Sequence, residues 1–143
     1  MLRDLHNNIK CVIAEPPVAA QTDNTAIVSS IIDTANFGSV EFVGIFGTNT
    51  DADVTFTVLF EDGDNASLTD NAAVDDAFLL GVEAMGLDFA DDNSVFKIGY
   101  IGPKRYCRVT VTPANNAAGN IFFAAVWILG HPRNLPQSTQ VVA

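Results

Sequence analysis

Residues 97–113 read KIGYIGPKRYCRVTVTP, and this stretch predicts two β-strands joined by a tight turn at Gly102 and Pro103. Glycine and proline punctuate a chain at turns, whereas β-branched and aromatic residues on either side are typical of strands. In the second strand the side chains alternate in character, which is the period of a strand with one buried face. The apolar members are Cys107, Val109 and Val111, and the members expected on the other face are Tyr106, Arg108 and Thr110.

The same period of two continues outward along the chain. Residues 39–46 and 54–60 each predict a strand, and the polar residues 47–53 between them have the length of a hairpin connection. Residues 72–85 have irregular apolar spacing interrupted by Gly81, which favours a loop with at most a short helical turn. Further strands are expected over residues 9–13, 25–32, 66–69, 94–101, 104–112 and 120–129.

The strand at residues 120–129 holds the longest apolar run, which predicts burial on both faces, with Trp127 in the core. About seven or eight short strands with little helix are typical of an all-β antiparallel β-sandwich or barrel, jelly-roll-like in form. A length of 143 residues suits a single domain over residues 1–143. We expect extended arms at its ends, at about residues 1–8 and 131–143.

Charge is distributed unevenly along the chain. The net charge is −10, and twelve of the seventeen carboxylates lie between residues 51 and 92. No Lys or Arg occurs between residues 11 and 96, and four of the seven basic residues fall within residues 97–113. Because DNA binding depends on Lys and Arg contacts to phosphates, this balance argues against a nucleic-acid partner. An acidic protein surface is the better partner for the basic residues.

Six basic residues are therefore candidate interface residues: Arg3, Lys97, Lys104, Arg105, Arg108 and Arg133. Two interpretations remain open for those within residues 97–113. They form ion pairs with the protein's own acidic loops, which contribute about 0–1 kcal/mol each when exposed. Alternatively, they dock on an acidic neighbouring subunit, where charges set register and orientation. Both interpretations can hold together in an oligomer.

No catalytic, cofactor or metal site is indicated by the residue pattern. A calcium loop counted from Asp62 would need a glutamate at its twelfth position, where Ala73 stands. The acidic pairs at residues 75–76 and 91–92 have no histidine nearby, which favours exposed loop charges over acid–base chemistry. The two histidines and two cysteines lack the spacing of a zinc site. We therefore expect neither an enzyme nor a bound cofactor.

Cys11 and Cys107 each lie in an apolar run, which favours free, buried thiols; a disulfide would need Cα atoms within about 7 Å. The longest apolar run is shorter than the roughly 20 residues that a membrane helix needs. The N-terminal MLRDLHNNIK lacks the continuous apolar region of a signal peptide. We expect a soluble protein made in the cytoplasm, with no membrane partner.

Several motifs resemble, in the same order, those of small virion proteins of tailed bacteriophages. They are Asp4-Leu5 with Asn7-Asn8-Ile9, GSVEFV at 38–43, KIGYIG at 97–102, KRY at 104–106 and GHPR at 130–133. The resemblance spans nearly the whole chain, and its motifs are structural rather than catalytic. The acidic stretch at residues 62–92 matches least. The resemblance implies a capsid decoration, or cement, protein.

Such a protein would be made in the host cytoplasm and reside on the capsid surface of the virion, where it stabilises contacts between major capsid protein subunits. Attachment at a three-fold point would favour a homotrimer. Two alternatives remain open. One is a structural component of the tail or the head–tail junction. The other is a host-surface carbohydrate-binding module, although its polar aromatics, Tyr100, Tyr106 and Trp127, are all expected within strands.

Overall fold

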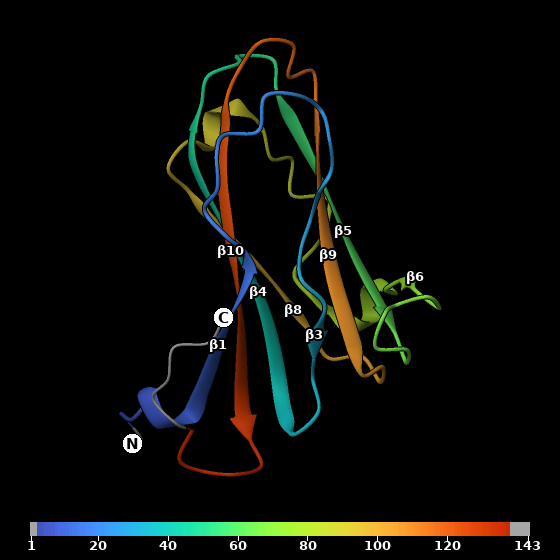
Figure 1. Cartoon of the computed structure of the whole chain (residues 1–143). Coiled ribbons are helices and arrows are strands. Elements are labelled where there is room, and N and C mark those ends of the chain that lie inside the picture. Colours follow the sequence, from blue (N-terminus) through green and yellow to red (C-terminus); the bar gives the residue numbers. More distant parts are fainter. Residues whose placement is uncertain (1–2, 138–143) are drawn as a thin grey trace.

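The apolar alternation of the sequence builds two antiparallel β-sheets that pack face to face as a β-sandwich (Figure 1). The computed structural model describes residues 3–137. In spatial order, sheet A contains β1 (Ile9–Glu15), β10 (Ile121–Pro132), β4 (Phe37–Asn49), β8 (Val95–Tyr100) and β7 (Leu79–Leu80). Sheet B contains β2 (Ile27–Val28), β9 (Tyr106–Ala114), β5 (Thr55–Gly63) and β6 (Ala72–Ala73), and β3 (Ile32–Asp33) also pairs with β9.

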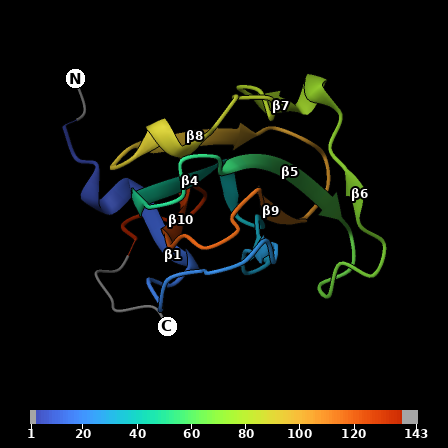
Figure 2. The same ribbon diagram turned by 90° about the horizontal axis from the view of Figure 1, so that it is seen from above.

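The all-β prediction is confirmed, and the two sheets make the molecule a sandwich rather than a barrel. The described chain holds ten strands, more than the seven or eight expected. The difference comes from β2, β3, β6 and β7, which have two residues each and are too short to show a period. Three single-turn helices, η1 (His6–Asn8), η2 (Asp76–Phe78) and η3 (Phe89–Asp91), complete it. Seen from above, β1 and β7 lie at opposite edges, with β6 on the β7 side (Figure 2).

The hydrophobic core lies between the sheets and is centred on Trp127 of β10, which is fully buried as predicted. Its ring meets the edges of Phe42 from the same sheet and Phe60 from the opposite sheet, at centroid distances of 5.1 and 5.8 Å. Its Nε1 donates a hydrogen bond to the Ser30 carbonyl at 3.1 Å. Both sheets therefore close on one aromatic side chain whose single polar atom is satisfied.

The predicted hairpin at residues 97–113 is wrong. Its two strands exist, but β8 pairs with β4 and β7 in sheet A, whereas β9 pairs with β5, β2 and β3 in sheet B. Residues 101–105 therefore carry the chain from one sheet to the other. The alternation within β9 is confirmed, because its apolar set faces the core.

Tyr100 explains why this connection crosses the sandwich. Its ring stacks on Phe60 of sheet B, with centroids 5.6 Å apart. Its hydroxyl donates to Asp62 Oδ2 at 2.6 Å and accepts from the Lys104 amide at 3.0 Å. A Cβ at Gly102 would come within 2.5 Å of the ring, so only glycine leaves room for it. The glycine accommodates an aromatic bridge between sheets instead of a hairpin turn.

Two smaller predictions are also wrong. Residues 50–54 lead from β4 in sheet A to β5 in sheet B, so they do not close a hairpin. Residues 66–69 form a turn instead of a strand, and the partner of β5 at this edge is β6. The Asp70 carboxylate accepts hydrogen bonds from the amides of Asp64 and Asn65, at 2.9 and 3.2 Å. One side chain thus closes the loop.

The two ends of the described chain lie together. The Gln137 amide donates to the Asn7 carbonyl at 2.9 Å, and the Arg133 amide donates to the Asn36 carbonyl at 2.8 Å. Within the expected N-terminal arm, η1 is a helical turn rather than an extended segment, and the first two residues of the expected C-terminal arm still belong to β10. Residues 1–2 and 138–143 of the expected arms lie outside the described residues.

Candidate interaction surface

The six basic residues proposed as interface residues do not form one patch. Arg3 and Lys97 lie on the outer side of sheet A, Lys104 and Arg105 lie in the connection between the sheets, Arg108 points outward from sheet B, and Arg133 follows β10. The sequence brought four of them together, but the crossing of the chain between sheets separates them. Their contact with a neighbouring subunit stays a prediction.

Three of these cations form ion pairs within the chain. Arg105 Nε and Nη2 donate to the two carboxylate oxygens of Asp33 at 2.9 and 2.7 Å, and these bonds hold the pKa of Asp33 below its ordinary value. Arg108 Nε and Nη2 both donate to Glu61 Oε2, at 3.0 and 2.8 Å. Lys104 pairs with Asp64. The interpretation as pairs with the chain's own acidic residues therefore holds for these three.

Several acidic residues between 51 and 92 accept hydrogen bonds from backbone amides of the chain. Asp75 caps η2 by accepting from the Ala77 amide, and Asp88 caps η3 by accepting from the Ala90 amide. Asp92 accepts from the Asn49 amide at 2.6 Å. Within residues 3–137, no three His, Cys, Asp or Glu side chains gather as metal ligands would. These carboxylates serve to shape loops.

The two cysteines are both free, but only Cys107 is buried as expected, and this burial raises the pKa of its thiol. Cys11 is exposed on the outer side of β1, so the prediction that it is buried is wrong.

Of the polar aromatics, Tyr100 and Trp127 are buried in the core, and Tyr106 is half-buried under the Arg105 guanidinium, 5.1 Å from its ring centre. All three lie in strands, as predicted.

The outer side of sheet A is apolar over its three adjacent strands β1, β10 and β4. We call this surface the β10 face. Its members, placed on one side of the sheet by the register, are Cys11, Ile13, Val43, Ile45, Ala124, Val126 and Ile128. Ile13 and Ile45 are 47% and 43% exposed, and the three β10 residues are half-buried. The expectation that β10 is buried on both faces is therefore wrong for this isolated chain.

A second apolar surface continues from sheet A to its far edge, and we call it the β7–β8 edge. It consists of Phe78, Leu80, Val95 and Ile101, whose exposed fractions are 40%, 55%, 64% and 54%. Pairing of Leu80 with Gly99 and a hydrogen bond from the Ile101 amide to the Phe78 carbonyl at 2.9 Å bring these residues together. Lys97 projects from the same side of β8.

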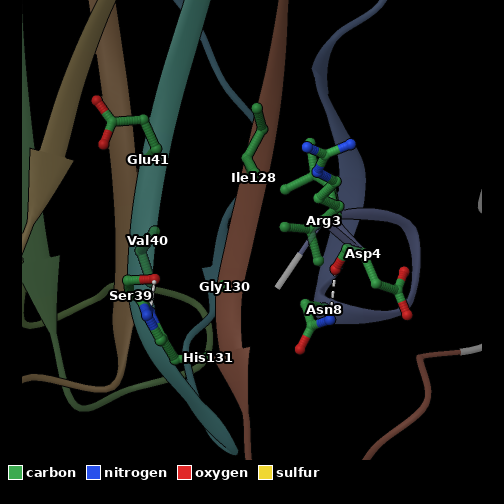
Figure 3. A pocket seen from close by; sticks show the side chains of 11 residues that line it. Arg3, Asp4, Asn8, Ser39, Val40, Glu41, Ile128, Gly130 and His131 are labelled. Atoms are coloured by element: carbon green, nitrogen blue, oxygen red, sulfur yellow. Dashed lines mark hydrogen bonds between the residues drawn. The ribbon is translucent and has the colours of Figure 1, made fainter. Parts of the chain in front are cut away.

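Glu41 lies between the two apolar surfaces at the level of Gly99, whereas at the level of Ile45 and Val95 the two surfaces adjoin. A Cβ at Gly99 would approach Glu41 Oε2 to 2.8 Å, so the carboxylate lies over the bare backbone of β8. Burial raises the pKa of Glu41, and the charge of Lys97 opposes this effect. Beside it, a groove of about 470 Å³ runs between residues 3–9 and the lower part of the β10 face. Figure 3 shows Arg3 and Glu41 on opposite sides of Ile128 in this groove.

The outer side of sheet B differs in character. Threonines occupy most of it, at positions 55, 57, 110 and 112, together with the Arg108–Glu61 pair. Leu59 and Val28 are its exposed large apolar side chains, at 40% and 48%. The sandwich therefore has one polar side and one apolar side. The sequence signal for the apolar side was the unbroken apolar run of β10, in which alternate residues point away from the core.

Comparison with known proteins locates the fold but not a family. No protein-family model and no curated protein matches the chain. Among solved structures, the exported protein XepA of PBSX aligns with a TM-score of 0.50 and 13% identity, over 94% of this chain and 39% of that chain. The chain thus spans about two fifths of XepA, and this likeness shows the sandwich fold.

Two structures align more weakly. Infectious bursal disease virus has a TM-score of 0.47 and 10% identity, over 90% of this chain and 34% of that chain. The Bacillus endospore appendages have a TM-score of 0.41 and 14% identity, over 91% of this chain and 96% of that chain.

Among residues 3–137, no helix has the length and hydrophobicity to cross a membrane.

Proposed function

We propose that this chain is a non-enzymatic structural protein of a tailed-bacteriophage virion, and more specifically a head decoration protein. It binds the outer capsid surface and stabilises contacts between major capsid protein subunits. The motifs at residues 4–9, 38–43, 97–102, 104–106 and 130–133 support the lineage. The observation that supports the proposal is the β7–β8 edge, an exposed apolar strip on a molecule of net charge −10.

The β7–β8 edge has the chemistry that attachment to a protein shell requires. Burying a large apolar side chain contributes about 1.5–3 kcal/mol, of which the loss of free motion on binding offsets a part. Leu80 and Val95 are more than half exposed, so docking has apolar surface to bury. Lys97 lies between them and can pair with a carboxylate of the shell, which would fix the orientation.

The rest of the surface suits the side that faces water. A net charge of −10 keeps decorated particles from adhering to one another, and the polar side of sheet B needs no partner. Attachment at three-fold positions of the shell would call for a homotrimer, since closed symmetry asks for matching copies.

Binding to heads that lack the protein tests this proposal. Purified protein is mixed with such heads, co-sedimentation measures its affinity, and the disruption temperature of the heads measures stabilisation. We expect Leu80→Lys and Val95→Lys to weaken binding at least about tenfold, because each buries an unpaired charge. Val28→Lys and Leu59→Lys on sheet B are the matched controls and should bind like the wild type.

Three results would contradict the proposal in different ways. If the wild-type protein neither binds heads nor raises their disruption temperature, it is not a head decoration protein. If it binds and the two edge variants bind equally well, the β7–β8 edge is not the contact. If it is located at a single vertex or forms a ring there, a component of the tail or the head–tail junction is the better assignment.

A further inference from the structure

The β10 face adjoins the β7–β8 edge, because Ile45 pairs with Val95, but it lies over a different set of strands, β1, β10 and β4. Strand β10 runs through its middle, with β1 on one side and β4 on the other. Ile13 of β1 and Val43 of β4 flank Val126, so the face is apolar on both sides of β10 at this level. At the level of Ile128, the flanking residues are Cys11 and Glu41.

The charges that border this face are opposite on its two sides. Arg3 lies beside β1, and Glu41 projects from β4, with Ile128 of β10 between them (Figure 3). Within the described residues, the side chains of Arg3 and Glu41 take part in no hydrogen bond or ion pair of the chain, although Lys97 lies near Glu41. Arg3 and Glu41 are therefore opposite charges on the two sides of β10, whereas Asp4, which lines the same groove, accepts hydrogen bonds from Asn7.

We propose that two copies of this chain pack β10 face against β10 face, about a two-fold axis that runs along β10. Such an axis places β1 of one copy over β4 of the other. Arg3 of each copy then meets Glu41 of its partner, and Ile13 meets Val43, while Val126 packs against Val126 of the partner. Every contact occurs twice, as an isologous interface requires.

Sheet geometry permits this contact. Two sheets pack with their strands nearly aligned and about 10 Å apart, with outward side chains filling the space. The β10 face offers three adjacent strands for this, about the width of the smaller layer of many sandwiches. The β10 face and the groove beside it extend along β10 from Ala124 to His131, so a partner contacts three strands over this length.

A second copy fits better than another partner because the face supplies its own complement. An unrelated partner would need an anion and a cation at the spacing of Arg3 and Glu41, whereas the two-fold axis provides both. The pairing also explains the apolar run in β10, since the partner buries the outward residues that the isolated chain leaves half-exposed.

Chemical cross-linking tests the position of the axis. Val126→Cys, in a Cys11→Ser background that removes the exposed thiol, places one thiol beside the axis in each copy. We expect a short bis-maleimide, which can span sheets about 10 Å apart, to give a covalent dimer in high yield, because only residues near a two-fold axis meet their own copies. Leu59→Cys in the same background, on the outer side of sheet B, should stay uncross-linked. A folded Val126→Cys protein that does not cross-link would overturn the proposal.

Charge reversal tests the pairing without relying on cysteine. Arg3→Glu or Glu41→Arg alone should weaken dimerisation about tenfold by sedimentation, and the double reversal should restore it to within about threefold. Thr57→Glu on the outer side of sheet B is the control, since it lies outside the paired strands and its dimerisation should not change. Single reversals without effect, or a double reversal that adds the two losses, would contradict the arrangement.

The molar mass in solution gives the overall answer and needs no capsid. A mass of twice the 15.2 kDa chain supports the pairing, and so does six times that mass, which would combine two-fold pairs with a three-fold contact elsewhere. A monomer or an isolated trimer at micromolar concentration would overturn it. Failure of head binding would leave this result unaffected, so the two proposals fail separately.

Discussion

At the scale of single residues, the buried carboxylate of Glu61 shows how an acidic chain keeps a polar group beside its core. Glu61 is 8% exposed, and both of its oxygens have partners. Oε2 accepts twice from Arg108, and Oε1 accepts from the Asn71 amide group. Removing one partner of a buried ion pair destabilises a protein strongly, because the remaining charge stays out of water without a counter-charge.

Arg108→Met is therefore expected to lower the free energy of unfolding by about 2–3 kcal/mol, because it leaves the Glu61 carboxylate buried without its cation. Urea denaturation measures the change. Arg105→Met is the matched control, since the Arg105–Asp33 pair is exposed and its loss should change stability much less. Equal losses in the two variants would show that burial of Glu61 does not decide the effect.

At the scale of elements, the β8–β9 connection determines the fold more than either strand does. It joins the two sheets, and Tyr100, which contacts Phe60 and Asp62 of sheet B, holds it in place. The stacked rings and the hydroxyl hydrogen bonds both require the chain to pass close to the phenol ring. Only a residue without Cβ fits at position 102.

Gly102→Ala is expected to destabilise the protein by about 1–3 kcal/mol, because the new methyl group displaces the Tyr100 ring from Phe60. Denaturant unfolding measures the loss, and near-ultraviolet circular dichroism reports the change around Tyr100. Pro103→Ala, one residue further and exposed, is the control and should stay within about 0.5 kcal/mol of the wild type. A Gly102→Ala protein as stable as this control would mean that the ring has room to move.

The sequence predicted the long strands well because each has its own period. Buried and less buried residues alternate along β9 from Tyr106 to Pro113 and along β5 from Thr55 to Phe60, so these faces could be assigned residue by residue. Which strands pair could not be assigned, because a short connection containing glycine has the same sequence pattern in a hairpin as in a crossing from one sheet to the other. What distinguishes them is Tyr100, whose partners on β5 lie far away in the chain.

The interaction surface was predicted least well. The uneven distribution of charge along the sequence led to six basic residues being predicted as interface residues. Three of them form ion pairs with acidic residues that are distant in sequence. The apolar surfaces come from β1, β4, β7, β8 and β10, and become contiguous only when these strands assemble. Val126 and Ile128 looked like core residues because a sequence does not show which side of a sheet is left uncovered.

At the scale of the whole molecule, acid should unfold the protein. Hydrogen bonds lower the pKa of five aspartates, Asp4, Asp23, Asp33, Asp51 and Asp70, below the ordinary value of 3.8. The unfolded chain then binds protons more readily than the folded one, so their contribution is full above that value and is lost as the pH falls below it. Burial raises the pKa of Glu15 and Glu41, which acts in the opposite direction at only two sites.

We expect the melting temperature to change little between pH 7 and about 5 and to fall below about pH 4. Calorimetry across this range measures it. Asp33→Asn removes one of the responsible carboxylates, so its melting temperature should be lower at pH 7 and should fall less steeply in acid. A melting temperature that rises as the pH drops from 4 to 3 would contradict this explanation.

The place of β10 in sheet A also governs how the chain can fold. Strand β1 has one strand partner, β10, which begins at Ile121, and β4 needs β10 on one of its edges. During synthesis, β1 and that edge of β4 must wait with unpaired backbone until β10 leaves the ribosome. A nascent chain stopped before Ile121 can pair β4, β8 and β7 but cannot add β1 to sheet A. Completion of β10 is therefore the step that joins β1 to β4, and long-range pairing of this kind makes folding slow.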